Sequence, residues 1–194
     1  MATALGTAIA LALTRYRFRG RATTNLFIFL PMATPEIVLG ASLLSMFVTA
    51  NVRRGLGTIL IAHVMFNISY VVVTVKARTQ GFNREWEEAA KDLGATPWTA
   101  FRTVTFPLIF PGVLAAAILA FALSVDDFVI TAFNAGQTTT FPLWVYGASR
   151  LGVPPQVNVL GTLVFVVGVS IALLSTVLER KGGRPPMAKE LLGP

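Results

Sequence analysis

The sequence predicts an all-α membrane protein whose helices cross the bilayer several times. Of its 194 residues, 54% are hydrophobic and only 13% are charged, and the mean hydropathy is +0.68. Soluble domains carry about 25% charged residues, so this composition indicates a chain that lies largely in lipid. The apolar residues gather in runs near the length of a bilayer-spanning helix, about 20 residues, and most basic residues lie between or beyond those runs.

The first apolar run, residues 2–13, is too short to span a bilayer. No basic leader precedes it, and four arginines follow it where a signal peptide would have a small-residue cleavage site. We therefore expect the second half of a transmembrane helix, with the chain N-terminally truncated or its true start upstream.

Four longer runs are expected to be complete spans. The first, residues 24–50, is interrupted by Pro31, Pro35 and Glu36. We expect its first third to be a separate segment at the membrane surface or one arm of a kinked helix. The other three runs cover residues 57–75, 106–133 and 157–178. The expected fold is thus a polytopic helical bundle with four full spans and one partial span.

The basic residues indicate the orientation of the chain. Thirteen of the sixteen Lys and Arg residues lie in segments 14–23, 76–105 and 179–194. Because cytoplasmic segments are rich in basic residues, we expect both termini and loop 76–105 in the cytoplasm. We divide the chain into a transmembrane domain, residues 1–179, and a cytoplasmic tail, residues 180–194. Lipid headgroups and topology then explain the formal charge of +7, so no nucleic-acid partner is expected.

The loop segment 83–102 predicts two short helical units in water. Asn83 is expected to cap the first unit, an acidic first turn complements its dipole, and Gly94 ends it. The second unit is expected to begin at Thr96-Pro97 and to end near Arg102.

Small side chains characterise one part of this loop. Ala89, Ala90 and Gly94 leave a flat surface into which a partner protein can pack, and a solvated connector is the alternative. The loop contains Glu88-Ala89-Ala90, then three residues, Gly94, nine residues and Val104-Thr105-Phe106-Pro107. This pattern resembles the EAA loop of the inner-membrane subunits of bacterial ABC importers. In that family the loop is a coupling helix that docks into the ATP-binding subunit. The resemblance assigns ATPase docking to Glu88, Ala89, Ala90, Gly94 and Pro107.

The resemblance covers nearly the whole chain. Segments 13–20, 124–130, 141–146 and 152–158 resemble the second permease subunit of spermidine/putrescine importers. This implies a type I ABC importer permease in the bacterial inner membrane. It also implies an ATP-binding subunit, a second homologous permease subunit and an extracytoplasmic substrate-binding protein as partners. Family members have six spans, so we expect the first and part of the second to be absent from this chain.

Three carboxylates are candidates for the substrate path. Ionisable groups inside a membrane are costly and mark function, and a carboxylate suits a polyamine cation. Asp126 and Asp127 are expected in the outer half of span 106–133, with an interfacial position as the alternative. They point about 100° apart, so one faces the path and the other a neighbouring helix or a backbone donor. A structural hydrogen bond is the alternative for each. Glu36, expected nearer the cytoplasmic side, either caps a helix or serves cation exit.

Nothing in the sequence indicates catalysis. It has no GxxxxGK[ST] nucleotide loop and no nucleophile with a base at a recognisable spacing. We expect no catalytic residue and no cofactor, with ATP bound by the partner subunit. His63, the only histidine, is expected to be packed and neutral, and no further residue is placed to complete a metal site.

Alternatives to a polyamine importer remain. The same importer class could carry a phosphonate, iron or a sugar. A membrane anchor or sensor without a transport role, or an inactive truncated subunit, would also fit the apolar runs and the charged loop.

Overall fold

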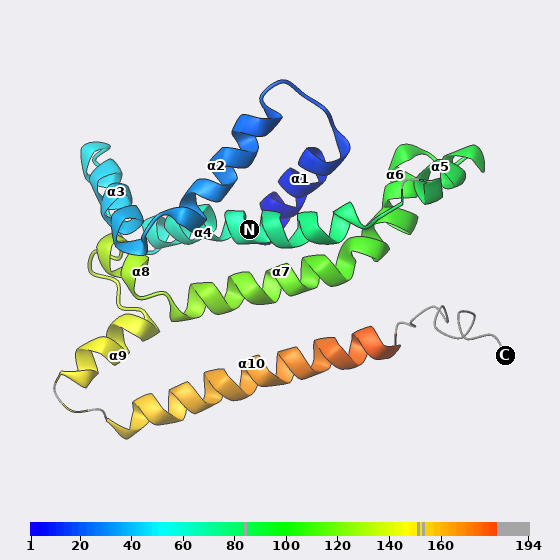
Figure 1. Cartoon of the computed structure of the whole chain (residues 1–194). Coiled ribbons are helices and arrows are strands. Elements are labelled where there is room, and N and C mark those ends of the chain that lie inside the picture. Colours follow the sequence, from blue (N-terminus) through cyan, green and yellow to red (C-terminus); the bar gives the residue numbers. More distant parts are fainter. Residues whose placement is uncertain (84, 151, 153, 182–194) are drawn as a thin grey trace. The chain divides into compact units, whose positions relative to one another are not determined.

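The computed structural model describes residues 1–83, 85–150, 152 and 154–181, and every regular element in these ranges is helical. The all-α prediction is confirmed (Figure 1). The elements are α1 (Ala2–Arg15), α2 (Arg21–Ala33), α3 (Glu36–Thr49), α4 (Leu56–Gln80), α5 (Glu85–Asp92), α6 (Pro97–Ala100), a π-helical turn (Phe101–Thr105), α7 (Phe106–Asp126), α8 (Val129–Asn134), α9 (Phe141–Ser149) and α10 (Pro155–Lys181). Helices α1–α9 belong to one compact unit, residues 1–153, and α10 to a second, which we describe by itself.

Helix α4 is the centre of the first unit, with α1, α2 and α7 packed against it. Small residues let these helices come close. A Cβ atom at Gly6 of α1 would lie 2.5 Å from Cγ1 of Val71, and one at Gly112 of α7 would lie 2.7 Å from Cβ of Arg78. The four helices share one buried apolar cluster, which consists of Ala10, Leu13, Ile28, Val71, Val72, Val75, Ala116 and Ala120.

A second apolar cluster joins α3 and α8 to the first half of α4. Its members are Leu39, Leu43, Phe47, Ala62, Phe66 and Ile130. The cluster lies at the end of α4 opposite to α5 and α6 (Figure 1). Glu36 precedes Leu39 by one turn of α3. The expectation that Glu36 lies nearer the cytoplasmic side stays a prediction.

The run 24–50 is not one helix. Helices α2 and α3 meet at 108°, with the break at Thr34 and Pro35. A proline disfavours helical backbone in the residue before it, and Thr34 is extended, with φ −86° and ψ 132°. Pro31 stays inside α2. The predicted interruption is confirmed, and the separate first arm is α2, which begins at Arg21 and covers residues 24–33 of the run, about its first third.

Two of the described helices are long and apolar enough to cross a membrane. They are α4 and the continuous helix from Pro97 to Asp126, and the bent pair α2–α3 is a third if it forms one span. The apolar part of α10 that was searched, Pro155–Ile171, is shorter, as is α1. By this criterion up to three of the four expected full spans are found. Of the expected tail 180–194, only the first two residues are described, and they end α10.

Candidate functional site

Helix α5 is the charged helix predicted in the loop between two spans. The Asn83 side chain accepts a hydrogen bond of 3.1 Å from the backbone N–H of Glu85 and so caps the helix start, as predicted. Glu85, Glu87 and Glu88 occupy the first turn, where the helix dipole favours negative charge. Gly94 follows the helix end with φ +88°, a backbone conformation that glycine adopts without steric cost.

The chain then passes from the loop into a span as one helix. Thr96 caps the start by accepting a hydrogen bond of 3.2 Å from the backbone N–H three residues on, and Pro97 is the first helical residue. The predicted end near Arg102 is wrong, because the π-helical turn Phe101–Thr105 continues into α7. This wider turn changes the hydrogen-bond pattern just before Pro107, which has no N–H to donate, so the helix does not break.

The residues assigned to docking lie in or just after α5, except Pro107, which lies in the first turn of α7. Glu88, Ala89 and Gly94 are exposed around α5, Ala90 is half-buried, and Pro107 begins α7. A helical segment connects the loop to α7 without interruption. A force applied to the loop therefore acts directly on a membrane-spanning helix.

Three large apolar side chains that the sequence analysis did not single out are also exposed here. Trp86 is 57% exposed, Leu93 90% and Trp98 69%. Exposed apolar side chains that lie close together mark contact surfaces. The signal in the sequence was their presence in an otherwise polar loop that is too short to bury them.

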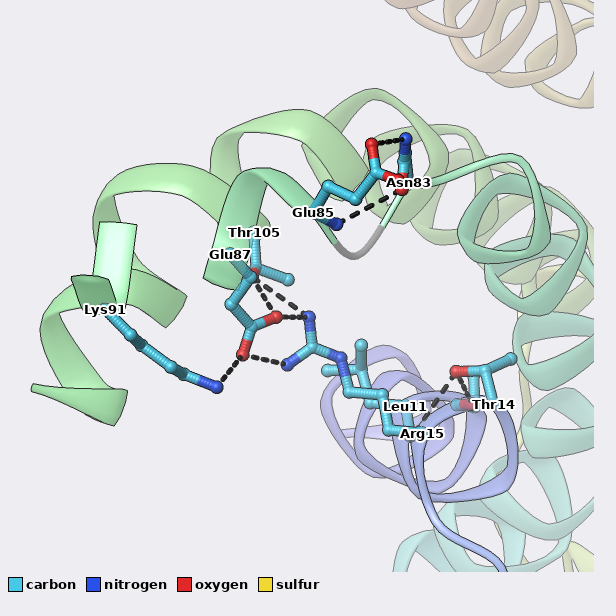
Figure 2. A network of polar contacts seen from close by, with 9 residues as sticks. Leu11, Thr14, Arg15, Asn83, Glu85, Glu87, Lys91 and Thr105 are labelled. Atoms are coloured by element: carbon cyan, nitrogen blue, oxygen red, sulfur yellow. Dashed lines mark hydrogen bonds and ion pairs between the residues drawn. The ribbon is translucent and has the colours of Figure 1, made fainter. Parts of the chain in front are cut away.

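The carboxylate of Glu87 joins three elements (Figure 2). Arg15, the last residue of α1, donates from Nη2 to Oε2 at 2.5 Å and from Nη1 to Oε1 at 3.4 Å. Thr105, at the start of α7, donates its hydroxyl to Oε2 at 3.2 Å. Lys91, one turn further along α5, lies 3.3 Å from Oε1. In the sequence, Arg15 is notable only as one of the basic residues and Glu87 only as part of an acidic first turn.

Glu87 is ionised in this setting. Burial raises the pKa of its carboxyl, but the charge of Arg15 and the hydrogen bonds from Lys91 and Thr105 together lower the pKa below its ordinary value. The side chains of Arg15 and Glu87 are only 20% and 15% exposed. The two residues therefore form a partly buried, bidentate ion pair, which is less screened by water than a surface pair.

Asp127 belongs to a second polar network, between α4 and α8. It accepts hydrogen bonds from the backbone N–H groups of Ile130 and Thr131, at 3.2 and 2.8 Å, and so caps α8. Nε2 of His63 lies 3.2 Å from Oδ2 of Asp127, and Nδ1 lies 2.7 Å from Oγ of Ser124. His63 is packed, as predicted. Asp127 therefore makes structural hydrogen bonds, which were the alternative to a place in the substrate path.

The other two path candidates are placed differently. The expected span 106–133 ends at Asp126, because Asp127 leaves the helical conformation with ψ 114° and starts α8. Asp126 is exposed, and Glu36 is exposed in the first turn of α3. Among the described residues, no hydrogen bond or ion pair joins Glu36 to either aspartate.

Residues 2–181 match the family described as binding-protein-dependent transport system inner membrane component. The chain belongs to this family. This inner-membrane component is 38% identical to the spermidine/putrescine transport system permease protein PotC of Haemophilus influenzae, over 93% of the chain and 71% of the relative. For PotC of Escherichia coli K12 the identity is 39%, over 92% of this chain and 68% of the relative. For the putrescine transport system permease protein PotI of the same strain it is 41%, over 87% and 63%.

Two solved structures share the fold of this inner-membrane component. A bacterial ABC transporter that imports the acidic polysaccharide alginate matches with TM-score 0.70 and 15% identity, over 95% of this chain and 74% of the other. The MetNI methionine ABC transporter in an inward-facing form matches with TM-score 0.69 and 19% identity, over 94% and 90%. The predicted ABC importer permease fold is confirmed.

Proposed function

We propose that this inner-membrane component is a permease subunit of an ATP-driven importer of polyamines, spermidine or putrescine. Two of its relatives are named for spermidine and putrescine transport and are 38% and 39% identical over 93% and 92% of the chain. The observation that carries the transport mechanism is the exposed helix α5, which connects through an unbroken helix to a membrane-spanning segment.

The α5 region docks an ATP-binding subunit. Exposed Leu93 and Trp98 supply apolar contact area, and Glu88, Ala89 and Gly94 form a surface of small and acidic groups beside them. When ATP closes the partner dimer, the docked helix moves and the membrane helices change between inward-facing and outward-facing arrangements. The energy comes from the partner, and this subunit supplies no catalytic residue and no cofactor.

Orientation and the remaining partners follow from charge. Both termini and loop 76–105 lie in the cytoplasm, since three segments hold thirteen of the sixteen basic residues. A second homologous permease subunit completes the pore in the bacterial inner membrane. A substrate-binding protein delivers the polyamine at the end of the subunit opposite to loop 76–105, where α8 and α9 lie.

Carboxylates in the path recognise the cationic substrate. Asp126 is exposed at the end of α7 and faces the path in the assembled pore. Asp127 holds α8 and His63 in place behind it. Glu36, exposed on α3, is the second path carboxylate. A carboxylate in low dielectric attracts an ammonium group more strongly than one in water does.

The direct test is uptake of radiolabelled spermidine and putrescine into cells that lack their own polyamine importer. The cells express this chain with a partner permease, an ATPase subunit and a binding protein. Saturable, ATP-dependent uptake is expected. Uptake of a phosphonate, iron or a sugar, and not of a polyamine, would contradict the proposed substrate and assign that compound in its place. An ATPase subunit that does not co-purify with the chain would point to an anchor or sensor without a transport role.

A variant separates docking from insertion. Gly94→Trp is expected to abolish uptake and ATPase co-purification while the chain still inserts into the membrane. Gly20→Trp is the matched control, because Gly20 also has a positive φ, +93°, and open space around it, but lies outside the α5 region. Normal transport by Gly94→Trp would contradict docking at this surface.

A further inference from the structure

We propose that Arg15 and Glu87 form a mechanical link that carries the movement of α5 into α1 and, through α1, into α4. This inference rests on the proposed function, since it concerns how a docked helix moves the membrane bundle. Arg15 is a positioning residue in this account. It acts through the carboxylate of Glu87.

The geometry makes Glu87 a junction between separate parts of the chain. Its Oε2 atom receives hydrogen bonds from Nη2 of Arg15 at 2.5 Å and from the hydroxyl of Thr105 at 3.2 Å. Its Oε1 atom receives Nη1 of Arg15 at 3.4 Å. Nη2 of Arg15 also donates to Thr105 at 3.0 Å. One carboxylate thus binds the end of α1 and the entry to α7 at once (Figure 2).

Neighbouring acidic residues of α5 do not make this connection. Glu85 bonds to Asn83, two residues away, and its side chain is exposed. Glu88 is exposed on the α5 surface. Among the described residues, it is the Glu87 carboxylate that forms an ion pair with Arg15 of α1, and Lys91 supports it from the next turn.

From Arg15 the contact continues along α1. Leu13 and Ala10 of the same helix are fully buried and pack with Val71 and Val75 of α4. Further along, Gly6 lies directly against Val71. A packed helix pair of this kind moves as a unit, because close-packed side chains resist deformation. Displacement of α5 is therefore transmitted to α1 and α4 together.

Among the described residues, the other main contacts of α5 are with α6 and the π-helical turn. Without the ion pair, movement of α5 reaches α1 and α4 only indirectly, through α7, which packs against both. A bidentate arginine pair is suited to the connection, because its two parallel hydrogen bonds fix orientation as well as distance.

The first test measures the number of ATP molecules hydrolysed per polyamine transported in the assembled, reconstituted complex. Arg15→Gln and Glu87→Gln are each expected to raise this ratio about fivefold or more, with the amount of bound ATPase unchanged. The double variant is expected to be no worse than either single variant, because one interaction is lost in all three. Reduced folding alone would lower the amount of complex and leave the ratio unchanged.

Two matched controls make the same charge changes nearby. Arg17→Gln lies just after α1 and Glu85→Gln lies in the first turn of α5. Both controls are expected to keep the ratio of the unmodified chain, singly and combined. The proposal is overturned if the Arg15 and Glu87 effects add independently, if they are absent, or if the controls match them.

A cross-link tests whether the two ends move together. The chain has no cysteine, so the pair Arg15→Cys and Glu87→Cys can be bridged selectively by a short bismaleimide, which spans more than a disulfide. Without the bismaleimide, the double cysteine variant is expected to hydrolyse more ATP per polyamine transported than the unmodified chain does. Bridging the two cysteines is expected to restore the ratio of the unmodified chain. If bridging instead stops transport, the contact must open in each cycle, and a permanent link is excluded.

A last measurement is independent of transport. In the purified chain, Arg15→Gln is expected to speed amide hydrogen exchange in α5 several-fold relative to α4, because the helix loses its anchor. Failure of the unmodified chain to bind an ATPase or transport a polyamine would reject the proposed function. Unchanged exchange in α5 would reject the link, whatever the transport result.

Discussion

Oδ2 of Asp127 accepts two hydrogen bonds from Thr131, one from its backbone N–H at 2.8 Å and one from its hydroxyl at 2.6 Å. Thr131 also lies 2.8 Å from Nε2 of His63. The carboxylate therefore caps α8 and holds it against α4. Asp127 and its neighbour Asp126 have the same chemistry but different surroundings, because Asp127 is held in this network while Asp126 is exposed.

Asp127→Ala is expected to destabilise the chain. Loss of a capping carboxylate costs about 1 kcal/mol, up to about 2, and His63 and Thr131 lose a polar partner as well. Thermal unfolding of the detergent-solubilised chain measures the effect. Asp126→Ala is the control, since Asp126 is exposed, and it is expected to unfold like the unmodified chain. Equal stability of the two variants would contradict the capping role.

Asp126→Asn is expected to reduce polyamine uptake at least about tenfold, which corresponds to about 1.4 kcal/mol of lost interaction. The charge that attracts the ammonium groups disappears, while the size of the side chain is kept. Uptake assays at several substrate concentrations measure the change, and the amount of inserted protein is compared in parallel. Full uptake by Asp126→Asn would remove this residue from the path.

The exposed leucine of the loop gives a prediction about docking. Leu93→Ser removes a side chain that is 90% exposed, so the stability of the isolated chain is expected to change by less than about 0.5 kcal/mol. Binding of the ATPase subunit is expected to weaken about tenfold, since buried apolar anchors dominate interfaces. Quantitative co-purification checks this. Phe18→Ser, also at an exposed apolar residue in a basic segment, is expected to bind normally.

Local signals predicted the elements of the charged loop well. Asn83 caps α5 and Gly94 follows it with positive φ, as the residue types indicated. The break at Pro35 followed from the restriction that a proline places on the backbone of the residue before it. These features depend on residues close together in the sequence, so the sequence alone can indicate them.

Features that depend on distant residues were not predicted. Arg15 and Glu87 are 72 positions apart, and nothing local to either residue indicates the other. The end of α7 was placed too late because an apolar run continues past Asp127, and only the contacts with Thr131 and His63 show that the aspartate starts a new helix. Long-range pairing decides such positions.

The low pKa of Glu87 predicts how stability changes with pH. Burial opposes ionisation, but Arg15, Lys91 and Thr105 lower the pKa below 4.5, so the ionised form is stabilised in the folded chain. This contribution is fully present above about pH 4.5 and is lost as the pH falls through the lower, folded-state pKa. The melting-temperature difference between the unmodified chain and Glu87→Gln is therefore expected to be constant near neutrality and to shrink as the pH falls below 4.5. A difference that stays constant as the pH is lowered until the chain unfolds would contradict it.

The contact between Gly6 and Val71 predicts a limit on side-chain size in α1. A Cβ atom at Gly6 would lie 2.5 Å from Cγ1 of Val71, so even Gly6→Ala must push the two helices apart. Overpacking of this kind costs about 1 to 3 kcal/mol, and Gly6→Leu is expected to cost more than Gly6→Ala. Gly57→Ala is the matched control, because a Cβ atom there meets nothing within 4 Å and alanine favours helix. Thermal unfolding should rank Gly57→Ala at or above the unmodified chain, then Gly6→Ala, then Gly6→Leu. If Gly6→Ala were as stable as the control, α1 would not be fixed closely to α4, and movement of Arg15 would not reach α4 through this contact.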